Sequence, residues 1–152
     1  MQRKIMFICT GNICRSAMAE KMLKRKIEER NINDKFLVCS AGIYAYPDDK
    51  STYEAIKIMK DEYGIDLSSH RATAIRESNI EDMDLILCMT SAHMNTLKSI
   101  YPNLENRIFL IKEYVGLSGD VEDPYGGTLN TYLSCAEELN YYIDLLLEKE
   151  GF

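Results

Sequence analysis

Residues 5–16 read IMFICTGNICRS, an apolar run followed by a short stretch that holds two cysteines and an arginine. The run Ile5–Ile8 is almost continuously hydrophobic, as expected of a parallel strand buried on both faces. Apolar residues at helical spacing begin just beyond Ser16. Cys9 therefore lies where a strand ends, and the chain must turn tightly before a helix begins. This succession of strand, loop and helix sets the expected architecture.

Three further apolar runs predict the other strands of the same sheet. They are Phe36–Cys39, Leu85–Met89 and Ile108–Ile111, and each is short and nearly continuous. Amphipathic helical patterns separate them. Strands that alternate with helices are typical of an α/β fold with a parallel sheet. In such folds ligands bind at the carboxyl ends of strands, where the strand order reverses, which is where Cys9 is expected.

Four apolar stripes predict the helices. The stripes comprise Ala19, Met22, Leu23 and Ile27; Ala55, Ile56, Met59 and Tyr63; Leu97 and Ile100; and Tyr132, Leu133, Ala136, Leu139, Ile143, Leu146 and Leu147. Gly64 is a candidate C-cap of the second helix and Ser91 a candidate N-cap of the third. The last helix is expected to begin near Thr128. No repeat, low-complexity tract or linker divides the chain, so residues 1–152 are expected to form one domain.

The overall composition narrows the classes of function. The chain is 46% hydrophobic and 28% charged, which is typical of a soluble globular protein. Its formal net charge of −6, with no long basic run, argues against nucleic acid or an anionic membrane as a partner. The N-terminal apolar run is too short for a signal peptide or a membrane span. Five irregularly spaced cysteines argue against a disulfide framework and for a reducing compartment, so we expect a cytoplasmic protein. We also expect it to be a monomer.

Cys9 and Arg15 are separated by five residues, the C-x5-R arrangement of a phosphate-binding catalytic loop. Backbone N–H groups of a loop that curls into a helix N-terminus bind a tetrahedral dianion, and a guanidinium holds two of its oxygens. Gly11 and Asn12 tolerate the left-handed backbone that such a loop requires. The same spacing is also compatible with a buried strand-end cysteine and an ordinary surface arginine. The expected phosphate-binding segment comprises Thr10, Gly11, Asn12, Ile13, Cys14, Arg15 and Ser16.

A thiolate that attacks a phosphoester needs a proton donor for the departing oxygen. The segment Gly119–Gly127 reads GDVEDPYGG, and Asp123 precedes a proline that biases it toward an extended conformation. Taken alone the segment is a plain turn, but beside the Cys9 loop Asp123 becomes the candidate general acid. Asp120 and Glu122 are the next candidates.

Taken together, these motifs resemble the low-molecular-weight protein-tyrosine phosphatases over essentially the full chain. The matching residues are CTGNICRS, the Ser40-Ala41-Gly42 segment, LILCM near the middle, and DPYGG before the last helix. The resemblance implies a three-layer fold with a four-stranded parallel sheet and helices on both faces. It also implies a cysteinyl-phosphate intermediate, with Cys9 as nucleophile, Arg15 as phosphate clamp and Asp123 as general acid and then base.

The resemblance assigns supporting roles as well. Ser16 would stabilise the Cys9 thiolate, Asn12 would hold the loop with support from Ser40, and Cys14 would form a reversible disulfide with Cys9. No metal or other cofactor is implied. Two departures stand out: the family usually has proline where this chain has Ala17, and often a second aromatic residue where this chain has Gly126.

The expected substrate is a phosphorylated protein, and the choice of phosphoamino acid depends on Ile13. The stretch 112–127 resembles the protein-arginine phosphatase branch of the family, but that branch carries threonine where this chain has Ile13. Isoleucine offers an apolar wall that suits a phenyl ring, and Tyr46 and Tyr125 would complete the slot. The sequence therefore favours phosphotyrosine and leaves phosphoarginine as the alternative.

Three other kinds of function are less well supported. An arsenate reductase needs further cysteines on a mobile segment, whereas the later cysteines, Cys39, Cys88 and Cys135, fall in regular strand or helix patterns. A non-catalytic phosphate-binding module would not need Cys9 or Asp123. A zinc site at Cys9 and Cys14 lacks ligand-like spacing to the two histidines, His70 and His93. His70 is expected to pack near the site or to cap a turn.

Overall fold

The computed structural model describes all residues, 1–152, and its centre is a four-stranded parallel sheet. The strands are β1 (Arg3–Cys9), β2 (Phe36–Gly42), β3 (Leu85–Cys88) and β4 (Ile108–Leu110), in the order β2-β1-β3-β4. Every predicted strand is present. The third and fourth strands end one residue earlier than predicted. Ile111 instead begins a one-turn helix, α4 (Ile111–Tyr114), which the sequence analysis missed.

Four longer helices follow the predicted stripes. They are α1 (Arg15–Glu29), α2 (Tyr53–Tyr63), α3 (Ser91–Ile100) and α5 (Leu129–Lys149), and short 3₁₀ helices lie at Asn33–Lys35, Ile75–Glu77, Ile80–Asp82 and Pro102–Arg107. Gly64 caps α2 in the left-handed conformation, with φ of 63°, and Thr128 is the N-cap of α5. The proposed N-cap of α3 was wrong by one residue. Thr90, not Ser91, accepts the hydrogen bond that caps this helix, because Ser91 is already its first residue.

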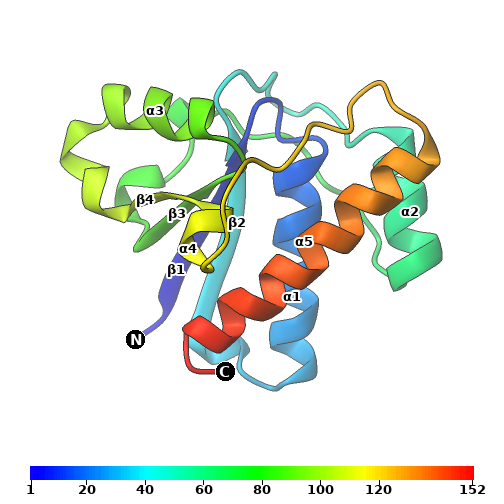
Figure 1. The fold of residues 1–152 in the computed structure, drawn as a ribbon, viewed down its shortest axis with the longest axis horizontal. Coiled ribbons are helices and arrows are strands. Elements are labelled where there is room, and N and C mark those ends of the chain that lie inside the picture. Colours follow the sequence, from blue (N-terminus) through cyan, green and yellow to red (C-terminus); the bar gives the residue numbers. More distant parts are fainter.

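The two faces of the sheet bury separate apolar cores, which confirms the three-layer arrangement. Alternate residues of β1 point in opposite directions: Ile5 and Phe7 join the larger core with α1, α2 and α5, while Met6 and Ile8 join the smaller core with Leu97 of α3. Figure 1 shows α1, α2 and α5 on one side of the sheet and α3 on the other. No helix is long and apolar enough to cross a membrane.

The C-terminal end of β1 lies at the point where the strand order reverses. The chain passes from β1 to β2 on one side, and β3 and β4 then extend the sheet on the other. The helices that follow β1 and β2 therefore lie on the opposite face from α3, and a crevice opens above β1. Cys9, the last residue of β1, is positioned at this crevice.

Candidate active site

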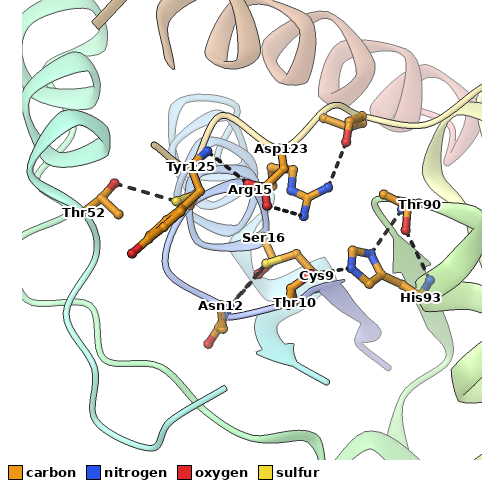
Figure 2. A network of polar contacts seen from close by, with 12 residues as sticks. Cys9, Thr10, Asn12, Arg15, Ser16, Thr52, Thr90, His93, Asp123 and Tyr125 are labelled. Atoms are coloured by element: carbon orange, nitrogen blue, oxygen red, sulfur yellow. Dashed lines mark hydrogen bonds and ion pairs between the residues drawn. The ribbon is translucent and has the colours of Figure 1, made fainter. Parts of the chain in front are cut away.

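Residues 10–14 form a tight loop between Cys9 and the first residue of α1, Arg15 (Figure 2). Asn12 adopts the left-handed conformation, with φ of 57°, as predicted for the reversal. Gly11, which also tolerates this conformation, has no positive φ. One left-handed residue is therefore enough to turn the loop, and it is held by its side chain.

Two hydrogen-bond donors converge on the sulfur of Cys9. The hydroxyl oxygen of Ser16 lies 2.9 Å from Cys9 Sγ, and the backbone N–H of Asn12 donates to the same sulfur at 3.3 Å. Hydrogen bonds to the charged form of a group stabilise that form, so this arrangement suits a thiolate nucleophile. Cys9 is almost fully buried, yet it lines a pocket that opens to the surface.

The side chain of Asn12 is buried beneath the loop and fastens it to three other segments. Its Nδ2 group donates to Ser16 Oγ at 2.9 Å and to Ser40 Oγ at 2.8 Å, while its Oδ1 atom accepts from the backbone N–H of Thr73 at 2.9 Å. The predicted contact between Asn12 and Ser40 is present. Because the side-chain oxygen Oδ1 of Asn12 accepts from an N–H donor, the orientation of the side-chain amide is fixed. Both hydrogens on Nδ2 then point to hydroxyl oxygens.

The direction of each hydrogen bond in this network follows from its far end. Ser40 donates its hydroxyl hydrogen to Glu20 Oε1 at 2.5 Å, so its oxygen is free to accept from Asn12. Ser16 likewise accepts from Asn12, which leaves its own hydrogen to point at Cys9. The buried carboxylate of Glu20, whose other oxygen pairs with Lys24, thus fixes the direction at Ser40, and the N–H of Thr73 fixes the Asn12 amide that directs the Ser16 hydrogen to the nucleophile.

Two further residues, Gly42 and His70, lie against the backbone of the loop. A Cβ atom on Gly42 would lie 2.6 Å from the carbonyl oxygen of Thr10 and 2.9 Å from the amide nitrogen of Asn12, so only glycine allows this close approach. His70 Nε2 lies 2.8 Å from the backbone carbonyl oxygen of Asn12. This position confirms the expectation that His70 packs near the site, and burial lowers its pKa.

Arg15 lies under the pocket and contacts the segment that carries the candidate acid. Its Nη1 group donates to the carbonyl oxygen of Val121 at 2.9 Å, and Nη2 lies 3.5 Å from Asp123 Oδ2. The side chain of Asp123 is 51% exposed, and its Oδ1 atom accepts from the backbone N–H of Tyr125 at 3.1 Å. The guanidinium and the carboxylate thus lie next to each other in the lining of the pocket that Cys9 also borders (Figure 2).

The two alternative acids are directed elsewhere. Asp120 accepts a hydrogen bond from the backbone N–H of Ser91 at the start of α3. Glu122 borders a separate surface hollow beside α5 and is absent from the lining of the Cys9 pocket. Asp123 is the candidate that the structure brings to the nucleophile.

The pocket above Cys9 is an open slot of about 320 Å³ with aromatic walls. Of the predicted slot residues, Ile13, Tyr46 and Tyr125 all line it, and the two tyrosine side chains are largely exposed at its rim. Tyr44 and Asp49 line the slot as well and were missed. Their segment follows β2 without a regular pattern, so the sequence held no signal for them. The residues that line the slot are Cys9, Thr10, Gly11, Ile13, Cys14, Arg15, Tyr44, Tyr46, Asp49, Asp123 and Tyr125.

Two members of the predicted phosphate-binding segment do not line this slot. Asn12 and Ser16 are fully buried, and their side chains support the loop from below rather than facing the pocket. Cys14, the N-cap residue of α1, does line it, and its sulfur lies 3.4 Å from the hydroxyl of Tyr132. Burial raises the pKa of Cys14.

The remaining cysteines lie in regular elements, as predicted. Cys39 is in β2, Cys88 in β3 and Cys135 in α5. Burial raises the pKa of Cys39 to about 11 and that of Cys135 to about 12, and it raises the pKa of Cys88 further. These thiols lie in strands and a helix, whereas the relay cysteines expected of an arsenate reductase lie on a mobile segment.

His93 contacts the loop in a way that the sequence analysis missed. Its Nε2 atom lies 2.9 Å from Thr10 Oγ1, and its Nδ1 atom accepts from the backbone N–H of Thr90 at 3.2 Å. Thr90 and His93 form a capping box at the start of α3. The available signal was the spacing Thr90-x-x-His93, which has the form of a capping box with histidine in the usual place of Glu or Gln. Both ring nitrogens of His93 thus have hydrogen-bond partners within the protein.

Comparison with known proteins agrees with this geometry. A family model described as low molecular weight phosphotyrosine protein phosphatase matches residues 4–150. A protein-arginine-phosphatase of Bacillus subtilis is 38% identical over 136 residues, which cover 89% of this chain and 88% of the relative. A low molecular weight protein-tyrosine-phosphatase of Staphylococcus haemolyticus is 34% identical over 145 residues, which cover 94% of this chain and 96% of the relative.

A solved structure extends the match to three dimensions. The crystal structure of a low molecular weight protein tyrosine phosphatase from T. tengcongensis superposes with a TM-score of 0.92 at 44% identity, over 97% of this chain and 99% of that chain. The similarity therefore includes both the sequence and the complete sheet with its helices. This chain belongs to the low molecular weight phosphotyrosine protein phosphatase family.

Proposed function

We propose that this phosphatase hydrolyses phosphotyrosine in proteins through a cysteinyl-phosphate intermediate. The observation that carries the proposal is the placement of Cys9, Arg15 and Asp123 around one slot, with two donors directed at the sulfur. The loop amides and the Arg15 guanidinium supply the positive charge that stabilises a phosphoryl group in transfer. If Cys9→Ser loses turnover but still binds an oxyanion, the protein is a phosphatase and not a non-catalytic phosphate-binding module.

The proposed reaction has two steps. In the first, the Cys9 thiolate attacks phosphorus, the bond to the ester oxygen breaks, and the protonated Asp123 carboxyl gives its proton to the departing phenolate. In the second, the Asp123 carboxylate takes a proton from a water molecule that attacks phosphorus. The S–P bond then breaks, which releases inorganic phosphate and restores the Cys9 thiolate. The half-exposed position of Asp123 supports both roles, because this carboxyl reaches both solvent and slot.

Ile13 supports phosphotyrosine as the substrate. Its side chain lines the slot together with Tyr46 and Tyr125, so a phenyl ring that enters above Cys9 meets an apolar wall and two aromatic side chains. A flat ring held in this way places its phosphate at the floor, beside Arg15.

Phosphoarginine is the second candidate, and one observation favours it. The Bacillus subtilis relative, which is named a protein-arginine-phosphatase, is 38% identical to this chain, against 34% for the Staphylococcus haemolyticus tyrosine phosphatase. The expected difference lies at Ile13, where the arginine phosphatase branch carries threonine.

A direct comparison of substrates tests the assignment. Hydrolysis of a phosphotyrosine peptide and of a phosphoarginine peptide of the same flanking sequence is measured for the wild type and for Ile13→Thr. We expect the wild type to prefer phosphotyrosine and Ile13→Thr to shift the ratio of kcat/KM toward phosphoarginine. A strong wild-type preference for phosphoarginine, with little effect of Ile13→Thr, would overturn the proposal.

We also infer the oligomeric state, the location and the partners of the protein. The protein is a single-domain monomer over residues 1–152 that acts on phosphorylated proteins in the cytoplasm. It uses no metal or other cofactor and binds neither nucleic acid nor a membrane. The five cysteines are free thiols, which supports a reducing compartment. Cys14 borders the same slot as Cys9, which supports the prediction that it forms a protective disulfide with the nucleophile under oxidation.

A further inference from the structure

Thr10 stands beside the nucleophile in the chain and brings the only threonine or serine side chain to the lining of the slot. Its backbone carbonyl oxygen accepts from Tyr44, which fixes the main chain at this position. Its side-chain oxygen has one partner in the protein, His93 Nε2 at 2.9 Å. The direction of that hydrogen bond decides whether the Thr10 hydroxyl can donate a hydrogen to a ligand.

The helix cap determines this direction. The backbone N–H of Thr90 can only donate, so the Nδ1 atom of His93 that faces it at 3.2 Å must accept and carries no hydrogen. A neutral imidazole has one N–H group, which must then be on Nε2. Nε2 therefore donates to Thr10 Oγ1. Because the oxygen of Thr10 is the acceptor, the hydroxyl hydrogen is left without a protein partner.

The surroundings keep His93 in this neutral form. The ring is buried, and the positive charge of the Arg15 guanidinium disfavours its protonation, while the carboxylates of Asp120 and Asp123 oppose this effect more weakly. Burial is the main cause that lowers the pKa of His93, to about 4, and Arg15 adds to it. Protonation would also put a hydrogen on Nδ1, opposite the N–H of Thr90, and would break that hydrogen bond of the capping box.

We propose that His93 is a positioning residue that leaves the Thr10 hydroxyl free to donate a hydrogen bond to an oxygen of the bound phosphoryl group. A capping box needs only the Nδ1 atom of His93, so the contact of Nε2 with Thr10 is an additional feature that capping does not explain. Thr10 then adds a neutral donor to the loop amides and to Arg15. This inference rests on the proposed function, since the ligand it names is the phosphoryl group of the substrate.

Variants at two positions test the proposal. Thr10→Val removes the hydroxyl and keeps the shape of the side chain, and Thr10→Ser restores the hydroxyl. His93→Gln keeps an acceptor for Thr90 and a donor for Thr10. His93→Glu keeps the cap but can only accept, so it reverses the hydrogen bond and takes the Thr10 hydrogen away from the ligand. The readouts are the dissociation constant of orthovanadate and kcat/KM for a small aryl phosphate.

We expect Thr10→Val to weaken vanadate binding and kcat/KM about tenfold, as for one hydrogen bond to a charged group, while Thr10→Ser and His93→Gln stay close to the wild type. His93→Glu also adds a negative charge near Arg15, so it is made in both the wild-type and the Thr10→Val backgrounds. Its loss should be about tenfold larger with Thr10 present. Equal losses in the two backgrounds, or an unchanged Thr10→Val, would overturn the proposal. Thermal unfolding of each variant confirms that it is folded.

A spectroscopic measurement separates this proposal from the proposed function. The chain has two histidines, so ¹⁵N signals of the imidazoles are assigned with the single variant His70→Gln. We expect neutral His93 with hydrogen on Nε2 at neutral pH. Hydrogen on Nδ1 would overturn the inference, whatever the activity. If the wild type showed the expected tautomer and the coupled loss of vanadate binding but hydrolysed no phosphoester, the proposed function would fail and the inference would stand.

Discussion

Replacement of Asn12 tests whether one side chain holds the catalytic loop in its left-handed turn. Asn12→Ala removes three side-chain hydrogen bonds, to Ser16, Ser40 and the N–H of Thr73, each of about 1 kcal/mol. Alanine at φ of 57° adds strain of about 1 kcal/mol. The expected decrease in the free energy of unfolding is about 4 kcal/mol, a large part of the ~5–15 kcal/mol typical of a domain.

Asn12→Gly is the matched control, because it loses the same hydrogen bonds but adopts the positive φ without strain. It should be about 1 kcal/mol more stable than Asn12→Ala. Urea unfolding followed by circular dichroism measures both, since the chain contains no tryptophan for fluorescence. In the same variants, kcat/KM for an aryl phosphate should decrease more than tenfold. Equal stabilities of the two variants, or losses below about 1 kcal/mol, would refute the reasoning.

Three further predictions address other parts of the site. Asp123→Ala should lower kcat by ~10²–10⁴-fold, whereas Asp120→Ala should leave it nearly unchanged; steady-state kinetics would contradict the assignment if the two variants behaved alike. Gly42→Ala should destabilise the protein by about 1–3 kcal/mol, since its Cβ would lie 2.6 Å from a carbonyl oxygen, and urea unfolding measures this. Because folding lowers the pKa of His93 to about 4, the unfolded chain binds more protons than the folded chain between pH 6.5 and 4. The free energy of unfolding should therefore decrease by up to about 3 kcal/mol as the pH falls through that range.

Matched variants sharpen the last two measurements. Gly11 has no positive φ, and a Cβ atom at this position would have no contact nearer than 3.5 Å. The stability of Gly11→Ala should therefore stay near that of the wild type, in contrast to that of Gly42→Ala. His93→Gln should flatten the decline of stability toward acid and leave only the contributions of other groups. An unchanged slope would show that His93 is not the titrating group.

The strands and the longer helices were predictable because their signals in the sequence are local, whereas the three-layer arrangement came from the family resemblance. Continuous apolar runs such as Ile5–Ile8 identify buried strands, and a glycine such as Gly64 ends a helix wherever its neighbours lie. The boundary errors at Ser91 and Ile111 also have local causes. A polar residue just before a helix and the first residue of that helix look alike in sequence, and a one-turn helix is too short to show a period.

The residues assigned to the chemistry were predicted because each lies in a short motif. Cys9, Arg15 and Asp123 fall in short recognisable patterns, and the structure places them around one pocket. His93 was missed because its contact with Thr10 joins residues 83 positions apart. Glu20 was missed because a single acidic residue in an amphipathic helix resembles any solvated position until its burial against Ser40 is seen.

The central claim is that Cys9 carries the phosphoryl group between the two steps. It is tested most directly by rapid acid quenching of the Asp123→Ala variant with an aryl phosphate, followed by mass spectrometry of the peptide that contains Cys9. The account predicts one phosphoryl group on Cys9 that accumulates within the first turnover, because hydrolysis of the intermediate lacks its base, and none in Cys9→Ala. Turnover without a phosphorylated Cys9, or a phosphoryl group found on another residue, would contradict it.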